Sequence, residues 1–220
     1  MIEGIPVVGA RGAVLCFDVI SPYAYLFHEL VLRQPLDVAV DYRPVLFAGL
    51  LNAHGNKGPA EIERKRLFTY RFCTWYGAAH GIPFTMPATH PFNPIRFLRL
   101  ILALGCEPAV ITEVFRMLYS EGADPDAEET WQTLCSRLNV ADATALIEKP
   151  SVKSQLRENT ERAAQSGVFG VPTVIVGEEL FWGVDALPML RAYLADPTLF
   201  ASAAMQRAAS AQIGARRKNV

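Results

Sequence analysis

The amino-acid sequence predicts an α/β fold in which a long all-helical segment separates the two halves of one sheet. Three observations lead to this fold class. A strand, helix and strand pattern occupies residues 12–45, helical periodicity dominates residues 60–167, and a strand pair followed by a helix begins at Thr173. Strands that alternate with helices favour parallel pairing, and an uninterrupted run of helical patterns indicates a separate helical unit.

The first half begins with "GAVLCFDV", residues 12–19, a short apolar run typical of a buried strand. Ser21 and Pro22 follow, and they suit the N-cap and the first position of a helix that continues to Arg33. The segment "LDVAVDYRPV", residues 36–45, alternates apolar and polar residues until Pro44 ends the pattern. We therefore expect a right-handed βαβ unit with parallel strands.

The middle of the chain is expected to consist of one loop and then helices. Residues 49–61 contain Gly, Asn and Pro at short intervals, which predicts a loop. Helical spacing covers residues 60–79, where the basic run Arg64-Lys65-Arg66 is interpreted as a solvated face. After a proline-rich connector, helices are predicted at residues 95–104, 108–122, 130–138, 141–149 and 151–167, the last of them ended by Gly167.

The last part returns to a strand pattern. "TVIV" and "LFWG" flank a turn at Gly177-Glu178 and predict a β-hairpin, and "DALPMLRAYLAD" predicts a closing helix with Asp185 near its start. The order of elements is that of a thioredoxin-like fold with a large inserted all-helical domain. We assign residues 12–48 and 165–200 to the thioredoxin-like domain, residues 49–164 to the inserted helical domain and residues 201–220 to a short basic C-terminal tail.

The loop before the hairpin, Gly170 to Thr173, is a candidate binding element. In a thioredoxin-like fold this loop lies near the junction of the first strand and helix. A cis peptide bond before Pro172 would expose the backbone N–H and C=O of Val171 to an extended peptide laid alongside. The alternative is an ordinary proline at the start of a strand.

Composition excludes several classes of function. The net charge of −1 argues against a nucleic-acid-binding protein, and no apolar run reaches the roughly 18 residues that a membrane helix requires. The N-terminus has no long apolar segment of the secretory type, so the cytoplasm is the expected location. Four cysteines, expected to be buried thiols, and four histidines show no ligand spacing, so no metal site is predicted. The residues are Cys16, Cys73, Cys106, Cys135, His28, His54, His80 and His90.

Ser21 permits two interpretations. A serine before a helix is commonly a simple N-cap, because its hydroxyl accepts a hydrogen bond from a free backbone N–H. The same position lies in the positive field of the helix N-terminus, where a thiolate or another anion would be stabilised. The residue pattern alone leaves both interpretations open.

The segments "FDVISPYAYL", "GNKGP", "KPSVKSQLRENTERA" and "GVFGVPTVIVGEELFWGVDAL" resemble the DsbA-like branch of the thioredoxin superfamily. Within that branch they are similar to the 2-hydroxychromene-2-carboxylate isomerases and the kappa-class glutathione transferases. The resemblance extends over residues 13–195. It implies a glutathione-dependent enzyme, a small conjugated or aromatic carboxylate as substrate, and a homodimer.

The resemblance also implies roles for individual residues. Disulfide-handling relatives have C-P-x-C where this chain has Ser21-Pro22-Tyr23-Ala24, so dithiol exchange has no nucleophile here. Cys16 lies too early on the strand to replace it. In the glutathione-using relatives the serine is the expected residue, and the thiol arrives with glutathione. The other glutathione contacts carry over to Asn56 beside Gly55, to Val171 before Pro172, and to Val184-Asp185, with Asp185 facing the γ-glutamyl ammonium.

One departure from the family pattern concerns the substrate. Many isomerase relatives have a lysine a few residues before the Gly-Asn pair, suited to a substrate carboxylate, whereas this chain has Leu51-Asn52-Ala53-His54, with Lys57 after the pair. The expected function is a glutathione-dependent isomerase of the 2-hydroxychromene-2-carboxylate isomerase type in aromatic catabolism. The alternatives are a kappa-class transferase that conjugates electrophiles and a non-catalytic thiol-peptide-binding protein. A periplasmic DsbA-like oxidoreductase is opposed by the missing C-x-x-C.

Overall fold

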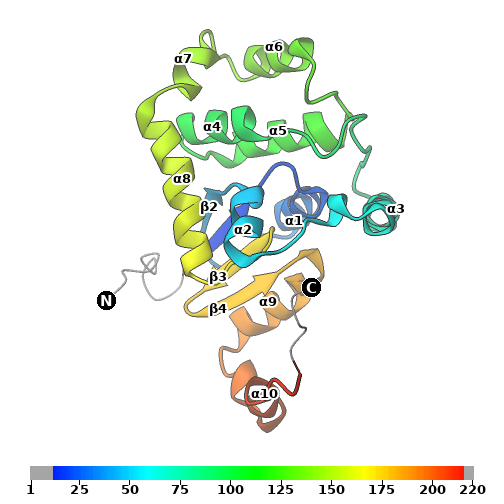
Figure 1. Ribbon diagram of the computed structural model, residues 1–220, viewed down its shortest axis with the longest axis vertical. Coiled ribbons are helices and arrows are strands. Elements are labelled where there is room, and N and C mark those ends of the chain that lie inside the picture. The colour runs from blue at the N-terminus through cyan, green and yellow to red at the C-terminus, as the bar shows by residue number, and fades with distance from the viewer. Residues whose placement is uncertain (1–11, 216–220) are drawn as a thin grey trace.

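The computed structural model describes residues 12–215, which contain a four-stranded mixed sheet with the order β2-β1-β3-β4 (Figure 1). The central strand β1 (Ala13–Phe17) pairs in parallel with β2 (Val40–Pro44) and antiparallel to β3 (Thr173–Val176). Strand β3 forms a hairpin with β4 (Glu179–Trp182), which is the opposite edge of the sheet. The predicted thioredoxin-like α/β fold is thus confirmed, including the parallel first pair and the terminal hairpin.

Helices surround this sheet. Their bounds, with the single-turn 3₁₀ helices marked η, are α1 (Pro22–Arg33), α2 (Phe47–His54), η1 (Pro59–Glu61), α3 (Glu63–Ala79), α4 (Ile95–Ala103), α5 (Pro108–Tyr119), α6 (Glu128–Arg137), α7 (Ala143–Ile147), α8 (Pro150–Gln165), η2 (Val184–Ala186), α9 (Leu187–Ala195), η3 (Leu199–Ala201) and α10 (Ala203–Ala209). None of these helices is both long and apolar enough to cross a membrane, as far as the described residues go.

Strand β1 is buried on both faces, because its side chains alternate between two hydrophobic clusters. Ala13, Leu15 and Phe17 belong to the larger cluster, to which α1, α4 and α5 contribute. Val14 and Cys16 belong to the smaller cluster, which α2 and α8 cover. An uninterrupted apolar run is what a central strand with both faces covered requires. The end of β1 is therefore held firmly where α1 begins.

Most of the predicted elements are confirmed within one or two residues. Ser21 is the N-cap of α1, Asp142 caps α7, and Gly167 ends α8 with a φ of 82°. Strand β2 begins only at Val40, later than the predicted residue 36. Residues 1–11 lie outside the described part of the chain, and so does the end of the tail.

The predicted loop at residues 49–61 is wrong in its first half, because α2 occupies Phe47–His54. Tertiary contacts stabilise this helix. Phe47 N donates to Asp18 Oδ2 at 2.8 Å, and Leu50 is fully buried. Gly49 belongs there because a Cβ atom would come within 2.7 Å of a Thr160 methyl carbon on α8. The glycine that indicated a loop instead permits close helix packing.

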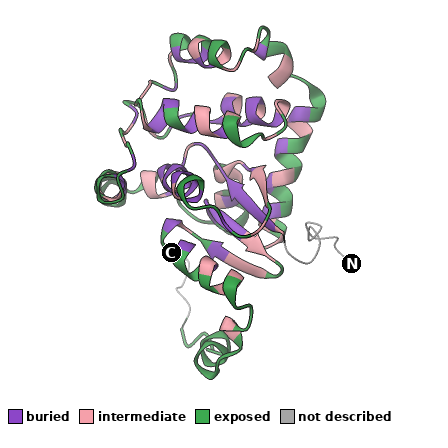
Figure 2. Ribbon diagram, turned by 180° about the vertical axis from the view of Figure 1, so that it is seen from behind, coloured by how far each residue is buried: buried purple, intermediate pink, exposed green. Residues whose placement is uncertain are grey.

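The predicted C-terminal tail also contains regular structure. Within the segment assigned to this tail, α10 forms at Ala203–Ala209 with Ser202 as its N-cap. All residues of α10 are exposed, as Figure 2 shows. The division into a thioredoxin-like and an inserted helical domain stays a prediction.

Helix α3 lies at the periphery and is largely exposed (Figures 1 and 2). Its buried strip consists of Thr69, Cys73 and Gly77, which face the body of the protein. The basic run at its start is exposed, as predicted. Phe68 and Trp75 are 65% and 62% exposed, so α3 presents aromatic surface to solvent.

Candidate functional site

Ser21 lies at the point where β1 ends and α1 begins. Its Oγ accepts a hydrogen bond from Ala24 N at 3.2 Å, which is the N-cap interaction that the sequence predicted. The same hydroxyl donates to the backbone carbonyl of Val171 at 3.3 Å. Ser21 therefore joins the start of a twelve-residue helix to the loop before the hairpin. Because this second bond is long, the hydroxyl proton can be redirected to another acceptor at small cost.

The Val171–Pro172 peptide bond is cis, as the sequence predicted. The carbonyl of Val171 faces Ser21 and accepts the bond from its hydroxyl. Within residues 12–215 no acceptor pairs with the N–H of Val171. A free N–H next to a weakly held C=O is the pair of groups with which an extended peptide adds to a strand edge.

The predicted residues Val184 and Asp185 lie beside this loop. Gly183 N donates to Pro172 O at 2.9 Å, and this bond fixes the segment that follows β4. Val184 is buried and Asp185 is exposed. Gly183 has a φ of 92°, and a Cβ atom there would collide with Asp185 Oδ1, so glycine is required on both counts. The carboxylate of Asp185 is thus held close to the backbone and open to solvent.

Aromatic rings lie near Asp185. Burial raises the pKa of Tyr76, and the negative charge of Asp185 raises it further. The pKa of Tyr23 is also raised, chiefly by burial, with a smaller contribution from Asp185. Tyr23, two residues after Ser21, contacts Phe72 of α3 with ring centroids 5.9 Å apart. Sequence reasoning missed this aromatic side of the site, although Tyr23 stands within the Ser21 motif.

Asn56 stands apart from the other predicted residues. It follows α2, is exposed, and its side chain makes no hydrogen bond within residues 12–215. An indirect connection exists through His54, whose Nε2 lies 3.0 Å from the carbonyl of Val168, three residues before Val171. The structure therefore places Asn56 near the loop before the hairpin, without contact to Ser21.

None of the four cysteines provides a reactive thiol. Cys16 and Cys73 are buried, and burial raises the pKa of each thiol to about 12, so both stay protonated at neutral pH. Cys106 and Cys135 are only half-buried, which corrects the expectation of four buried thiols. The pKa of both is nevertheless raised, mainly by burial. None of the four therefore stands as a low-pKa thiol beside Ser21.

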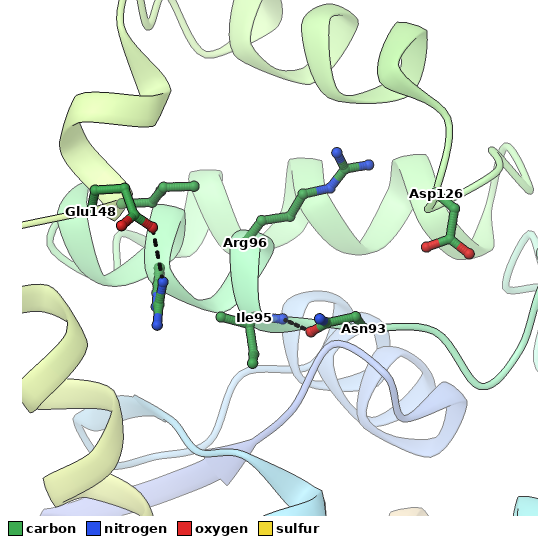
Figure 3. Close-up of a pocket in the computed structure, with 7 residues that line it drawn as sticks. Asn93, Ile95, Arg96, Asp126 and Glu148 are labelled. Atoms are coloured by element: carbon green, nitrogen blue, oxygen red, sulfur yellow. Dashed lines mark hydrogen bonds and ion pairs between the residues drawn. The ribbon is translucent and has the colours of Figure 1, made fainter.

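A pocket of about 320 Å³ lies elsewhere, at the start of α4 (Figure 3). Its lining includes two arginines and two acids, so its charges are largely compensated. Arg99 pairs with Glu148, and Arg96 donates to the backbone carbonyl of Ala127. Figure 3 also shows Asn93 accepting from the backbone of Ile95. No predicted site residue lines this pocket, and we do not assign the function to it.

The site lies at the junction of the first strand and helix of a thioredoxin-like fold, with Ser21 as the N-cap of α1. Residues 14–195 match the family described as DSBA-like thioredoxin domain, and the chain belongs to that family. The predicted family and fold are confirmed.

Two curated relatives and one solved structure illustrate the similarity. The chain is 29% identical over 189 residues to a 2-hydroxychromene-2-carboxylate isomerase from Sphingobium xenophagum, covering 82% of this chain and 96% of the relative. It is 29% identical over 201 residues to glutathione S-transferase kappa 1 of Rattus norvegicus, covering 82% and 88%. The solved structure of a 2-hydroxychromene-2-carboxylate isomerase superposes with a TM-score of 0.76 at 24% identity, covering 91% of this chain and all of that one.

Proposed function

We propose that this protein is a glutathione-dependent isomerase of the 2-hydroxychromene-2-carboxylate isomerase type, acting on an intermediate of aromatic catabolism. One observation carries the proposal. The Ser21 hydroxyl stands at the N-terminus of α1 and within hydrogen-bond distance of the loop at Val171-Pro172. A thiol-bearing peptide paired with that loop would bring its sulfur to the hydroxyl and to the helix N-terminus. Isomerases and glutathione transferases among the relatives support an enzyme of this kind.

The residues present fit glutathione. The backbone groups of Val171 pair with its cysteinyl unit, and the carboxylate of Asp185, beside Val184, receives its γ-glutamyl ammonium through a charge-assisted hydrogen bond. The exposed amide of Asn56 reaches the tripeptide from the end of α2. The hydrogen bond from Gly183 N to Pro172 O at 2.9 Å holds the two segments that carry Val171 and Asp185 together before the ligand arrives.

The catalytic task of Ser21 is to stabilise negative charge on sulfur. When bound, glutathione supplies a thiolate that adds reversibly to a conjugated substrate, permits rotation about the former double bond and leaves unchanged. A free thiol with a pKa near 8.5 is mostly protonated at neutral pH. The Ser21 hydroxyl donates to the sulfur instead of to Val171 O, and the partial positive charge at the start of α1 adds to the effect. Both interactions lower the pKa of the thiol.

One structural feature favours a kappa-class transferase as the second candidate. Asn52, Ala53 and His54 form the exposed last turn of α2, where isomerase relatives have a lysine for the substrate carboxylate. His54 is held by the carbonyl of Val168. A transferase that conjugates an uncharged electrophile needs no such cation, and the glutathione site would be the same.

The proposal extends to location and assembly. Four cysteines without a disulfide suit the reducing cytoplasm. A homodimer is part of the proposal, and the exposed aromatic side chains of α3, Phe68 and Trp75, form the surface best suited to a contact between copies. Light scattering of the purified protein measures its mass directly, and a monomer at all concentrations would remove this part of the proposal.

A panel assay tests the function. The protein is incubated with 2-hydroxychromene-2-carboxylate and with simple electrophiles, with and without glutathione. Isomerisation that requires glutathione and consumes none of it supports the isomerase, and a conjugate as product supports the transferase. Glutathione binding without any turnover of the panel supports the non-catalytic thiol-peptide-binding alternative.

A further inference from the structure

The peptide groups of Ile20, the residue before Ser21, are held from three directions. Ile20 N donates to Asp18 Oδ1 at 3.0 Å. The Ile20 carbonyl accepts from His90 Nε2 at 2.7 Å and from the Tyr119 hydroxyl at 2.7 Å. Because a carbonyl cannot donate, His90 carries its proton on Nε2. The Tyr70 hydroxyl lies 2.7 Å from His90 Nδ1 and 2.9 Å from the His90 carbonyl, and its single proton is shared between these two acceptors.

These three side chains come from distant parts of the sequence and meet only in the folded protein. Asp18 follows β1 and Tyr119 ends α5, and both are fully buried. His90 stands in the connector between α3 and α4 and is partly buried. Buried polar groups of this kind are costly when unpaired, so the arrangement around Ile20 is strongly specified.

The two hydrogen bonds that the Ile20 carbonyl accepts are shorter than those of the Ser21 hydroxyl. The Ser21 hydroxyl bonds to Ala24 N and Val171 O measure 3.2 and 3.3 Å, near the upper limit for such bonds, whereas both donors to the Ile20 carbonyl lie at 2.7 Å. The Ser21 backbone is thus held from the Ile20 side by these contacts, in addition to its own bonds from Ser21 N to Asp18 O at 3.1 Å and from Ala24 N to Ser21 O at 3.0 Å. Two donors on one carbonyl fix the plane of the Ile20–Ser21 peptide and hence the direction of the Ser21 side chain.

Asp18 adds a connection to the other side of the site. Its second oxygen, Oδ2, accepts from the backbone N–H of Phe47 at 2.8 Å, and Phe47 is the first residue of α2. That helix ends immediately before Gly55-Asn56. One buried carboxyl group thus joins the segment that carries Ser21 to the helix that precedes Asn56.

We propose that Asp18, His90 and Tyr119 form a junction clamp, a set of positioning residues that holds the Ile20–Ser21 peptide so that the Ser21 hydroxyl faces the ligand sulfur. The clamp touches neither glutathione nor substrate and acts through Ser21. Its consequence for catalysis rests on the proposed function of Ser21, whereas its effect on the order of the junction does not.

The chain offers a matched pair of substitutions. Tyr119→Phe removes the hydroxyl that donates to Ile20 O. Tyr25→Phe removes the hydroxyl of an equally buried residue, and this hydroxyl donates to the backbone carbonyl of Pro83, away from the junction. The two rings stack on each other with centroids 5.6 Å apart, so both changes are made in the same packing environment.

The first readout is amide hydrogen exchange of residues 20–24, which neither substitution changes, in the protein without ligand. We expect exchange in this segment to be about fivefold faster in Tyr119→Phe than in Tyr25→Phe, as the loss of one neutral hydrogen bond predicts, with similar exchange in α8. Equal exchange of residues 20–24 in the two variants overturns the clamp. If Tyr119→Phe does not fold, His90→Leu removes the other donor, and His90→Gln, which can still donate, restores slow exchange.

The second readout is the pKa of the thiol of bound glutathione, followed by the ultraviolet absorbance of the thiolate. We expect this pKa to rise in Tyr119→Phe and to stay at the wild-type value in Tyr25→Phe. Faster exchange with an unchanged thiol pKa overturns the catalytic consequence of the clamp. If the wild type binds no glutathione, the proposed function fails, and the exchange comparison still decides whether the clamp exists.

Discussion

Replacing Ser21 by alanine distinguishes its structural role as the N-cap of α1 from its proposed catalytic role, because the two roles predict losses of different size. The variant loses the bond from Ala24 N at 3.2 Å and the bond to Val171 O at 3.3 Å. Losing an N-cap costs about 0.5–2 kcal/mol, and the length of both bonds places the expected cost near 1 kcal/mol. In a chain of this size that corresponds to a decrease in Tm of about 2–4 °C. Ser21→Ala should therefore fold.

The expected loss of activity is much larger. Removing one preorganised donor from a developing anion typically lowers kcat by about 10²–10³, which is about 2.7–4 kcal/mol. The two effects differ enough to be told apart in one protein, by thermal unfolding and by turnover with glutathione. Ser202→Ala is the control, because Ser202 caps the exposed helix α10 through Met205 N at 3.4 Å and should leave turnover unchanged. A folded Ser21→Ala protein with wild-type kcat would refute the role assigned to the hydroxyl.

Two further predictions concern buried and exposed carboxyl groups. Asp185→Asn should weaken glutathione by about ten- to a hundredfold in calorimetric titration, because a charge-assisted bond is lost. Glu178→Gln in the exposed hairpin turn should not, and equal affinities would exclude the role of Asp185. Burial raises the pKa of Asp18 to about 7. From roughly pH 4 to pH 7 only the unfolded state is ionised at this residue, so the Asp18 contribution to the free energy of unfolding falls as pH rises, by about 4 kcal/mol at most. Denaturant unfolding of Asp18→Asn should lack this decrease relative to wild type, and identical pH dependence of the two proteins would contradict it.

Local signals explain what the sequence could predict. The run from Ala13 to Arg33 contains an apolar strand, a capping serine and a proline at the first helical position, and each acts on its immediate neighbours. The hairpin around Gly177 is equally local, since its turn and strand pattern lie within ten residues. Elements of this kind were predicted with nearly correct bounds.

Helix α2 shows why the rest could not be predicted. Its N-terminal backbone is held by Asp18 and by Thr160, whose Oγ1 accepts from Leu46 N at 2.9 Å. Gly49 is present for contact with α8, and local rules interpret such a glycine as a loop signal. Information of this kind lies in residues that are remote in the sequence.

The candidate site likewise contains residues that local sequence motifs predicted and residues that only the folded structure reveals. Ser21, Val171 and Pro172 belong to contiguous motifs, and the structure brings them together. His90 and Tyr119 lie 70 and 99 residues from Ile20 and act on a backbone carbonyl. Their sequence surroundings give no indication of that contact, so only the fold reveals them.

A crystal structure of the protein with glutathione tests the central claim most directly. The account predicts the cysteinyl backbone paired with Val171, the γ-glutamyl ammonium at Asp185, and the sulfur within hydrogen-bonding distance of Ser21 Oγ. Glutathione bound elsewhere, or bound here with its sulfur turned away from Ser21, would contradict it.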